Sequence, residues 1–197
     1  REAVKDDPTV MSEKLKEAAK AADMIITTGG VSVGKKDIMH ESLRLMGAER
    51  IFWRVKMKPG MPTLFSAYKK TSDITATYHC ASEREIPIIS LSGNPFGVAV
   101  SIELLIRPAL EKMMQDPSIG LKEVNGIMAD NFEKGIKGRR FIRAYLENGK
   151  FHLPNGLHSN GVLSSMAGCN CLIDTKTMEN QESRSLNAGD KVGAILL

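Results

Sequence analysis

A glycine-rich loop, set between a short apolar run and an amphipathic segment, constrains the fold of this chain more than any other feature. Residues 27–37 read Thr-Thr-Gly-Gly-Val-Ser-Val-Gly-Lys-Lys-Asp. Apolar residues 24–26 precede the loop, and residues 38–46 after it carry apolar side chains at helical spacing, which predicts a strand, a loop and a helix in that order. Because glycine lets the backbone approach a ligand closely, and the first amides of a helix donate to anions, this order predicts a phosphate or oxyanion site.

The same order recurs further along the chain. Residues 86–91 predict a buried strand, a Ser-Gly-Asn-Pro turn follows at residues 92–95, and residues 96–114 predict a helix that is disturbed near Pro108. In an open parallel sheet, the loops at the carboxyl ends of the strands converge on one crevice. We therefore expect the two glycine turns to line a single pocket, although they are far apart in the sequence.

The remaining pattern divides the chain into an α/β part and a β part. Asp7 and Pro8 are typical of an N-cap and a first helical position, and apolar residues follow at helical spacing. Residues 51–57 and 63–68 predict two further strands, joined by a turn with two prolines and a glycine. Helical periodicity then fades, and the short β-like runs near the end of the chain are residues 141–146, 162–166, 171–174 and 192–196. We therefore expect an α/β domain followed by a small β domain.

Bulk composition excludes several classes of protein. The formal net charge is only +4, from 27 basic and 23 acidic residues. The sequence also lacks the dense basic runs of a dedicated nucleic-acid binder. The 3 cysteines contain no Cys-x-x-Cys pair, which indicates neither a disulfide framework nor a zinc site and favours a reducing cytoplasm. No apolar run approaches the ~20 residues that span a bilayer, and the N-terminus has no signal-peptide pattern, so we expect no membrane partner. Because the chain begins at Arg1 without an initiator Met, we expect a part of a longer protein.

Four motifs, taken together and in order, resemble the MoeA family, which includes the E domain of gephyrin. They are the loop of residues 28–34 with Asp37, the Lys-Pro-Gly of residues 58–60, the Leu-Ser-Gly-Asn-Pro of residues 91–95 and the Gly-Val-Leu-Ser-Ser-Met of residues 161–166. The resemblance implies an α/β fold in which an incomplete MogA-like three-layer domain covers residues 1–118 and a small C-terminal β-barrel domain covers residues 119–197. It also implies that this chain is the C-terminal half of a longer protein, whose two N-terminal domains and first MogA-like strands lie outside it.

Members of this family are molybdopterin molybdenumtransferases of molybdenum cofactor biosynthesis. The resemblance implies that Mg²⁺ is the cofactor, that adenylylated molybdopterin and molybdate are the substrates, and that AMP is released. It further implies that the working unit is a homodimer, that a molybdopterin adenylyltransferase is the upstream partner, and that this fragment is inactive by itself.

The resemblance also assigns roles to single residues. Asp6, Asp37 and Lys58 match catalytic positions, and the two carboxylates suit an Mg²⁺ ion that bridges phosphates. The residues that match ligand-binding positions are Thr28, Gly29, Gly30, Ser32, Gly34, Arg54, Pro62, Ser92, Gly93, Asn94, Pro95 and Arg143. Two positions depart from the usual pattern, because Met61 replaces the second lysine of Lys-Pro-Gly-Lys-Pro and Ser92 replaces a proline. Met61 thereby removes a cation that is expected near molybdate.

Each of these assignments has a plainer structural alternative. The glycine loop is also read as a simple connection, Asp37 as the N-cap of the next helix, and Asp6 as an acid stabilised by a helix dipole. Lys58 and Arg54 are also read as solvated surface charges. Two other functions stay open: a MogA-like adenylyltransferase, which makes the adenylylated intermediate from ATP, and a non-catalytic scaffold module of the gephyrin type, for which Met61 is the reason.

Overall fold

A computed structural model describes most of the chain. The described residues are 3–4, 6–32, 34, 37–70, 84–133, 138–155, 161–175 and 185–197. They form two compact units, which we call the first unit (Arg1–Arg54 with Pro62–Gly93) and the second unit (Val55–Met61 with Asn94–Leu197). The domain boundary near residue 118 that the family resemblance implies stays a prediction.

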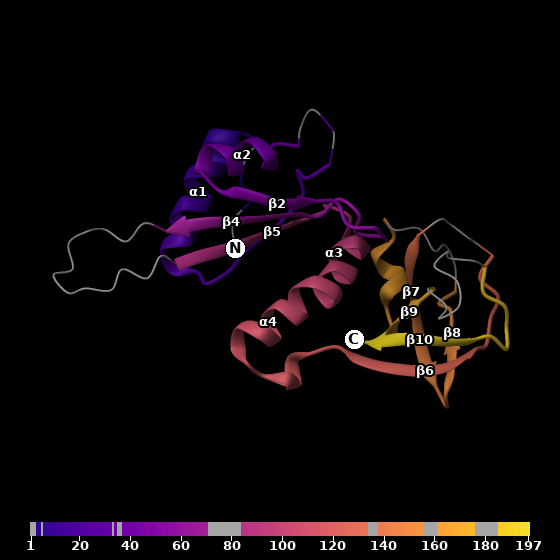
Figure 1. Cartoon of the computed structure of the whole chain (residues 1–197). Coiled ribbons are helices and arrows are strands. Elements are labelled where there is room, and N and C mark those ends of the chain that lie inside the picture. Colours follow the sequence, from indigo (N-terminus) through magenta and orange to yellow (C-terminus); the bar gives the residue numbers. More distant parts are fainter. Residues whose placement is uncertain are drawn as a thin grey trace. The chain divides into compact units, whose positions relative to one another are not determined.

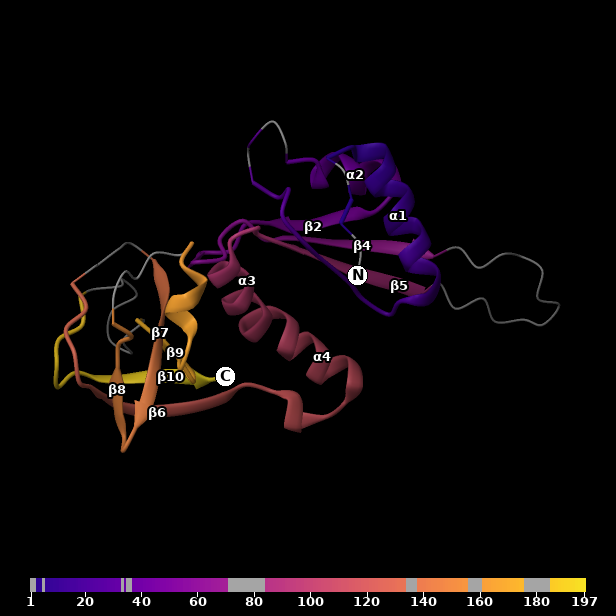
Figure 2. The ribbon, with the colours of Figure 1, turned by 180° about the vertical axis from the view of Figure 1, so that it is seen from behind.

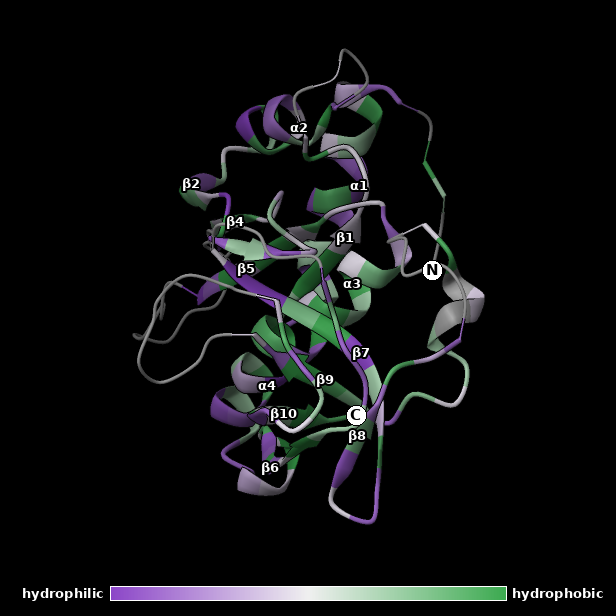
Figure 3. Ribbon diagram, turned by 90° about the vertical axis from the view of Figure 1, so that its right-hand side faces the viewer, coloured by the Kyte–Doolittle hydropathy of each residue, from purple (hydrophilic) through white to green (hydrophobic). Residues whose placement is uncertain are grey.

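The first unit is a mixed sheet with two helices on one face. The strands lie in the order β1-β5-β4-β2, with β1 parallel to β5 and the other neighbours antiparallel. Their bounds are β1 Ile25–Thr28, β2 Glu49–Trp53, β4 Leu64–Lys70 and β5 Arg84–Leu91. Helices α1 (Pro8–Ala21) and α2 (Met39–Met46) cover the sheet face that carries Ile25, Leu64 and Ile88, as Figure 1 shows. Both helices show green and purple segments in Figure 3, as amphipathic helices do.

Local capping explains where these helices begin and end. The Asp7 carboxylate accepts hydrogen bonds from Thr9 N at 2.8 Å and Val10 N at 3.1 Å, and Pro8 occupies the first turn of α1, as predicted. Helix α2 ends at Gly47, whose φ of 86° is the left-handed conformation that glycine adopts at low cost. These two helices are therefore specified by residues within one turn of their ends.

The strand predicted over residues 51–57 is wrong in its extent. Strand β2 ends at Trp53, because Arg54 has a φ of 73° and turns the chain out of the sheet. The next residues form β3 (Met57–Lys58), which pairs in parallel with β7 of the second unit. Arg54 and Lys56 already interrupt the apolar residues of this segment, but only pairing partners from distant segments decided where each strand stopped.

The second unit contains a closed five-stranded barrel, which confirms the predicted β domain. Its strands lie in the order β7-β8-β6-β10-β9, and the pairing of β9 with β7 closes the ring. Their bounds are β6 Lys122–Met128, β7 Arg139–Glu147, β8 Lys150–His152, β9 Cys171–Asp174 and β10 Lys191–Leu196. Figure 2 shows these strands grouped together from behind. The interior holds the buried side chains of Met128, Ile142, Ala144, Phe151 and Ile173.

A long helical segment packs on the outside of this barrel. It consists of α3 (Pro95–Ser101), a π-helical segment η1 (Ile102–Ile106) and α4 (Arg107–Met114). The disturbance predicted near Pro108 is confirmed, because proline has no N–H and its ring excludes the carbonyl four residues earlier, so the turn before it widens. Phe96 and Val100 of α3 pack with Phe141 of β7, Leu172 of β9 and Ile195 of β10.

The β-like run at residues 162–166 is not a strand. Leu163–Met166 form a 3₁₀ helix, η3, and a second short one, η2, spans Pro117–Ile119. Ala167 N donates to Ser164 O and Cys169 N to Met166 O, both at 3.0 Å, so local bonds take the place of a pairing partner. Within the described residues, no helix is both long enough and apolar enough to cross a membrane.

Candidate functional site

The two glycine turns lie side by side at one end of the first-unit sheet. Strands β1 and β5 are parallel neighbours whose last residues, Thr28 and Leu91, are paired, so the turns leave the sheet at the same edge. Gly29 N donates a hydrogen bond of 2.9 Å to Leu91 O. A Cβ added to Gly93 would lie 3.4 Å from the Cα of Gly29, a van der Waals distance, so the two turns pass close to each other at these glycines.

The first glycine loop turns sharply and approaches the start of α2. Gly29 and Gly30 have φ values of 91° and 66°, conformations that L side chains rarely adopt. Met39 N donates to Gly30 O at 3.1 Å, and a Cβ on Gly30 would lie 3.4 Å from Met39 Cγ. Ser32 is exposed on this loop. The loop therefore presents backbone rather than bulky side chains at this edge of the sheet.

Asp37 closes the loop instead of capping α2. Its carboxylate accepts a hydrogen bond from Gly34 N, and Asp37 N donates to Gly34 O at 3.0 Å. The N-cap residue of α2 is Ile38, which makes no side-chain capping bond. The half-buried Asp37 thus places a carboxylate on the loop itself. Asp6, the other predicted catalytic acid, is exposed just before α1.

Trp53 and Arg54 stand next to this loop. The Trp53 indole Nε1 donates to Val31 O at 3.0 Å, and the Arg54 guanidinium carbon lies 4.2 Å from the centre of the Trp53 ring. The exposed Arg54 is also held by its backbone, because its N–H donates to Thr63 O at 2.8 Å. Sequence reasoning named Arg54 and missed Trp53, because an aromatic residue that follows Ile51 and Phe52 gave no signal of a role in a site.

His40, on the first turn of α2, packs against the Trp53 ring. Its ring meets the Trp53 ring edge-on at 4.7 Å between centres. Burial lowers the pKa of His40 below its ordinary 6.5, Arg50 lowers it further, and Asp37 acts in the opposite direction. The imidazole is therefore kept neutral near pH 7.

Ser92 contributes a buried hydroxyl at the second turn. Its side chain is 7% exposed, and its Oγ has no hydrogen-bond partner among the described residues. A buried hydroxyl without a partner is costly, so this group is a candidate to bond a ligand. The other first-unit residues that sequence reasoning named are Thr28, exposed at the end of β1, and Pro62, half-buried beside Thr63.

The remaining predicted residues belong to the second unit. Asn94 is the N-cap of α3, where its side-chain oxygen accepts a hydrogen bond from Gly97 N at 3.1 Å, and Pro95 takes the first helical position. Lys58 is exposed on β3 and precedes a cis peptide bond to Pro59. Met61, in place of the family lysine, is 50% exposed.

Arg143 is enclosed by the second unit. It projects from the outer face of β7, is only 1% exposed, and lies with its guanidinium carbon 4.3 Å from the ring centre of Phe96 on α3. Burial lowers the pKa of Arg143 from its ordinary value, and Cys169 acts in the opposite direction. The structure therefore shows Arg143 packed on an aromatic ring, and its predicted role in ligand binding stays a prediction.

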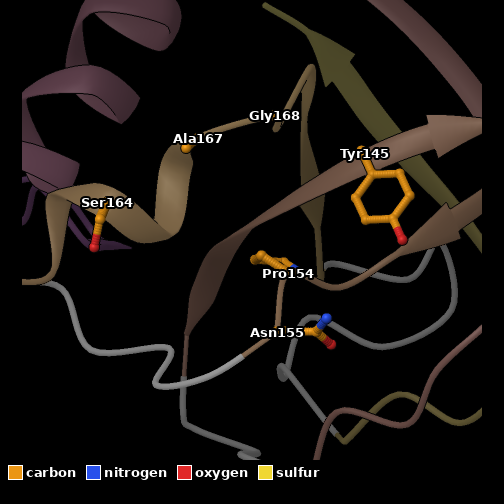
Figure 4. Close-up of a pocket in the computed structure, with 6 residues that line it drawn as sticks. All are labelled: Tyr145, Pro154, Asn155, Ser164, Ala167 and Gly168. Atoms are coloured by element: carbon orange, nitrogen blue, oxygen red, sulfur yellow. The ribbon is translucent and has the colours of Figure 1, made fainter.

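A shallow pocket of about 390 Å³ lies on the barrel (Figure 4). Its lining residues are Tyr145, Pro154, Asn155, Ser164, Ala167 and Gly168. Ser164 belongs to the motif of residues 161–166, which the sequence analysis named. The outward direction of Tyr145 could be predicted only once the bounds of β7 were known, because side chains alternate along a strand. The Tyr145 ring stacks on His152 with 5.0 Å between centres.

Comparison with known proteins decides the family. A family profile described as a probable molybdopterin binding domain matches residues 1–112, and one described as the MoeA C-terminal region (domain IV) matches residues 125–197. The chain belongs to the MoeA family.

A molybdopterin molybdenumtransferase of Staphylococcus aureus (strain COL) is 30% identical over 195 residues, which cover 98% of this chain and 42% of that protein. One of Bacillus subtilis (strain 168) is 29% identical over 162 residues, or 81% of this chain and 34% of that protein. The MoeA-like chain thus spans less than half the length of these relatives.

Solved structures agree with the fold. The molybdopterin biosynthesis MoeA protein of Pyrococcus horikoshii aligns with a TM-score of 0.70 and 17% identity, over 97% of this chain and 41% of that one. A molybdenum cofactor biosynthesis protein of Pyrococcus furiosus aligns with a TM-score of 0.66 and 18% identity, over 98% of this chain and 56% of that one. The mixed α/β part followed by a small five-stranded barrel is therefore a MoeA fold.

Proposed function

We propose that the protein inserts molybdate into adenylylated molybdopterin and releases AMP. The observation that carries the proposal is the contact between Gly29 and Gly93, within a domain of the molybdopterin-binding family. Two turns that present backbone at one edge of a sheet form a place where an extended, negatively charged ligand fits. The relatives named molybdopterin molybdenumtransferase support this reaction over other chemistry on the same fold.

Each first-unit residue has a task in this proposal. The backbone amides of Gly30 and Ser32 bind phosphate oxygens, because amide donors of a glycine turn stabilise an anion without a bulky side chain in the way. Gly29 and Gly34 shape the binding loop, since their own amides donate to Leu91 O and to the Asp37 carboxylate. Arg54 adds a fixed positive charge beside them. The buried Ser92 hydroxyl forms with the ligand the hydrogen bond that it lacks within the protein. Thr28 and Pro62 also contact the ligand in this proposal.

Magnesium fits the donor set on the loop. Asp37 offers a hard carboxylate oxygen next to amides that bind phosphate, and Mg²⁺ in such sites takes one or two carboxylates, with phosphates and water as its other ligands. Among the described residues no three His, Cys, Asp or Glu side chains form a group that would cage a metal ion. We propose Asp37 and Asp6 as the protein ligands. When bound, the ion polarises the phosphate bond that is hydrolysed.

Roles for the second-unit residues are proposed from the family resemblance. Lys58 is a catalytic cation, exposed and adjoining a rigid turn. Asn94, Pro95 and Arg143 belong to the ligand-binding set, together with Gly93 of the first unit. We also propose that the protein works as a homodimer in the cytoplasm and receives its substrate from a molybdopterin adenylyltransferase.

The decisive experiment measures AMP. The full-length protein is incubated with adenylylated molybdopterin, Mg²⁺ and molybdate, and AMP is quantified by chromatography. Asp37→Asn keeps an acceptor for Gly34 N but loses the charge, and we expect AMP release to slow by about a hundred-fold. Asp7→Asn is the matched control, because asparagine is as good an N-cap as aspartate and Asp7 has no proposed catalytic role.

Two results would decide against the proposal. Wild-type protein that releases no AMP would exclude molybdenum insertion. Protein that consumes ATP when given molybdopterin would instead be an adenylyltransferase, since an insertase needs no ATP. The domain IV match at residues 125–197 favours the insertase.

A further inference from the structure

We propose that Trp53 is a positioning residue that holds Arg54 and the glycine loop in a single arrangement for binding a phosphate-containing ligand. The inference deepens the proposed function and depends on it for the identity of the ligand. Trp53 is the only tryptophan of the chain, and it is half-buried at the end of β2.

The Trp53 indole contacts two partners, one through its Nε1 and one through the face of its ring. The Nε1 donor bonds Val31 O at 3.0 Å, and Val31 itself is anchored by a side chain that is only 1% exposed. The face of the ring carries the Arg54 guanidinium carbon at 4.2 Å from its centre. One rigid side chain therefore connects the loop backbone to the cation.

The backbone of Arg54 makes this stacking possible. A φ of 73° is uncommon for a residue other than glycine, and it persists only where surrounding contacts hold it. Here the Arg54 N–H donates to Thr63 O at 2.8 Å. The turn that ends β2 thus also places the guanidinium over the ring of the residue before it.

His40 supports the indole from the loop-to-helix junction. The edge-on contact at 4.7 Å is the arrangement that aromatic rings prefer, and it fixes the tilt of the indole relative to α2. The Trp53 ring is consequently held by α2, by the loop and by Arg54. An arginine that is stacked on a ring loses less conformational freedom when it binds an anion, so a stacked Arg54 binds phosphate more tightly than a free one.

A double-mutant cycle in the full-length protein tests this coupling. The dissociation constant for adenylylated molybdopterin is measured by calorimetry without Mg²⁺ and molybdate, so that no turnover occurs. We expect Arg54→Gln to weaken binding about ten-fold, as loss of a charged hydrogen bond does. We expect Trp53→Leu to weaken it about five-fold through the lost cation–π contact and loop bond. The double variant should lose about ten- to twenty-fold, less than the product of the two, because only the cation–π part of the Trp53 effect acts through Arg54.

Conservative and control variants separate positioning from general damage. Trp53→Phe retains a ring for Arg54 and should bind within about two-fold of wild type. Phe52→Leu changes an aromatic residue of the same strand that contacts Phe65, and Arg44→Gln removes a cation that pairs with Glu41. Neither control should change the affinity. Multiplicative losses in the cycle, or an equal loss from Phe52→Leu, would overturn the inference.

A measurement without ligand keeps the inference separate from the proposed function. Hydrogen exchange followed by mass spectrometry should show faster exchange over residues 29–32 in both Trp53→Phe and Trp53→Leu, because each lacks the donor to Val31 O. If wild-type protein fails to bind the pterin, the proposed function is wrong. If exchange in the loop is unchanged by Trp53→Phe, the positioning role is wrong, whatever the ligand.

Discussion

Gly29 and Gly93 are close neighbours, because a Cβ added to Gly93 would lie at a van der Waals distance, 3.4 Å, from the Cα of Gly29. The contact exists because β1 and β5 are parallel neighbours that end at the same edge. Each strand then delivers a turn of small residues to the same edge of the sheet. The molybdopterin-binding function that we propose depends on this proximity more than on any single charged side chain.

Replacement of Gly29 by alanine should separate a stability effect from a binding effect. Gly29 and Gly47 have φ values of 91° and 86°, and a Cβ on either would meet no atom within 4 Å. We therefore expect Gly29→Ala and Gly47→Ala each to lower the free energy of unfolding by about 1 kcal/mol, the cost of a left-handed alanine. Only Gly29→Ala should weaken the binding of adenylylated molybdopterin. Urea denaturation and calorimetry test the two effects, and equal affinities for the two variants would contradict a role for this turn.

Replacement of the adjacent acids Asp6 and Asp7 should have opposite effects on stability and on AMP release. Asp7 caps α1 through Thr9 N and Val10 N, so Asp7→Ala should lower the free energy of unfolding by about 1 kcal/mol and leave AMP release intact. The exposed Asp6→Ala should change stability by less than about 0.5 kcal/mol but reduce AMP release. Denaturation curves and the AMP assay are compared for both variants. Full activity in Asp6→Ala would remove Asp6 from the proposed magnesium site.

Restoring the family lysine should raise molybdate affinity. Met61 is 50% exposed, so Met61→Lys buries no charge and should leave stability unchanged. The added cation should tighten molybdate binding by about ten-fold, the usual value of a charged hydrogen bond, and less at high salt. Met114→Lys, at a position on α4 that is 61% exposed, is the matched control for added charge. If both variants or neither bind molybdate more tightly, the missing lysine is not what limits affinity.

Stability of the first unit should depend on pH through His40. Its pKa is lowered in the folded state, chiefly by burial and also by Arg50, so the unfolded chain binds a proton more readily. The free energy of unfolding should therefore be at its full value above pH 6.5 and fall as the pH drops through the lowered folded-state pKa. Urea titrations of the chain at several pH values, followed by the fluorescence of Trp53, measure this slope. His40→Gln should flatten it, and an identical slope in the variant would assign the dependence to other groups.

Local features of the fold followed directly from the sequence. The N-cap at Asp7, the helix of residues 38–46 that ends at Met46 and the disturbed helix before Pro108 were predicted correctly. In each case the deciding contacts lie within one helical turn, so neighbouring residues suffice to specify them. The motifs that resemble the MoeA family were also readable, because they are short and their order along the chain is kept.

Tertiary structure decided what depends on contacts between distant segments. The end of β2 at Trp53, the closure of the barrel by β7 and β9, and the burial of Arg143 under Phe96 have no local signal. The residues named for the site were predicted from the sequence, yet the link from Val31 through Trp53 to Arg54 was not. By itself, the sequence determined the helix caps, the glycine turns and most of the strands, because capping and periodicity act over a few residues. Only the folded chain decided which turns meet and which side chains connect them, because those contacts arise when strands far apart in the sequence pair.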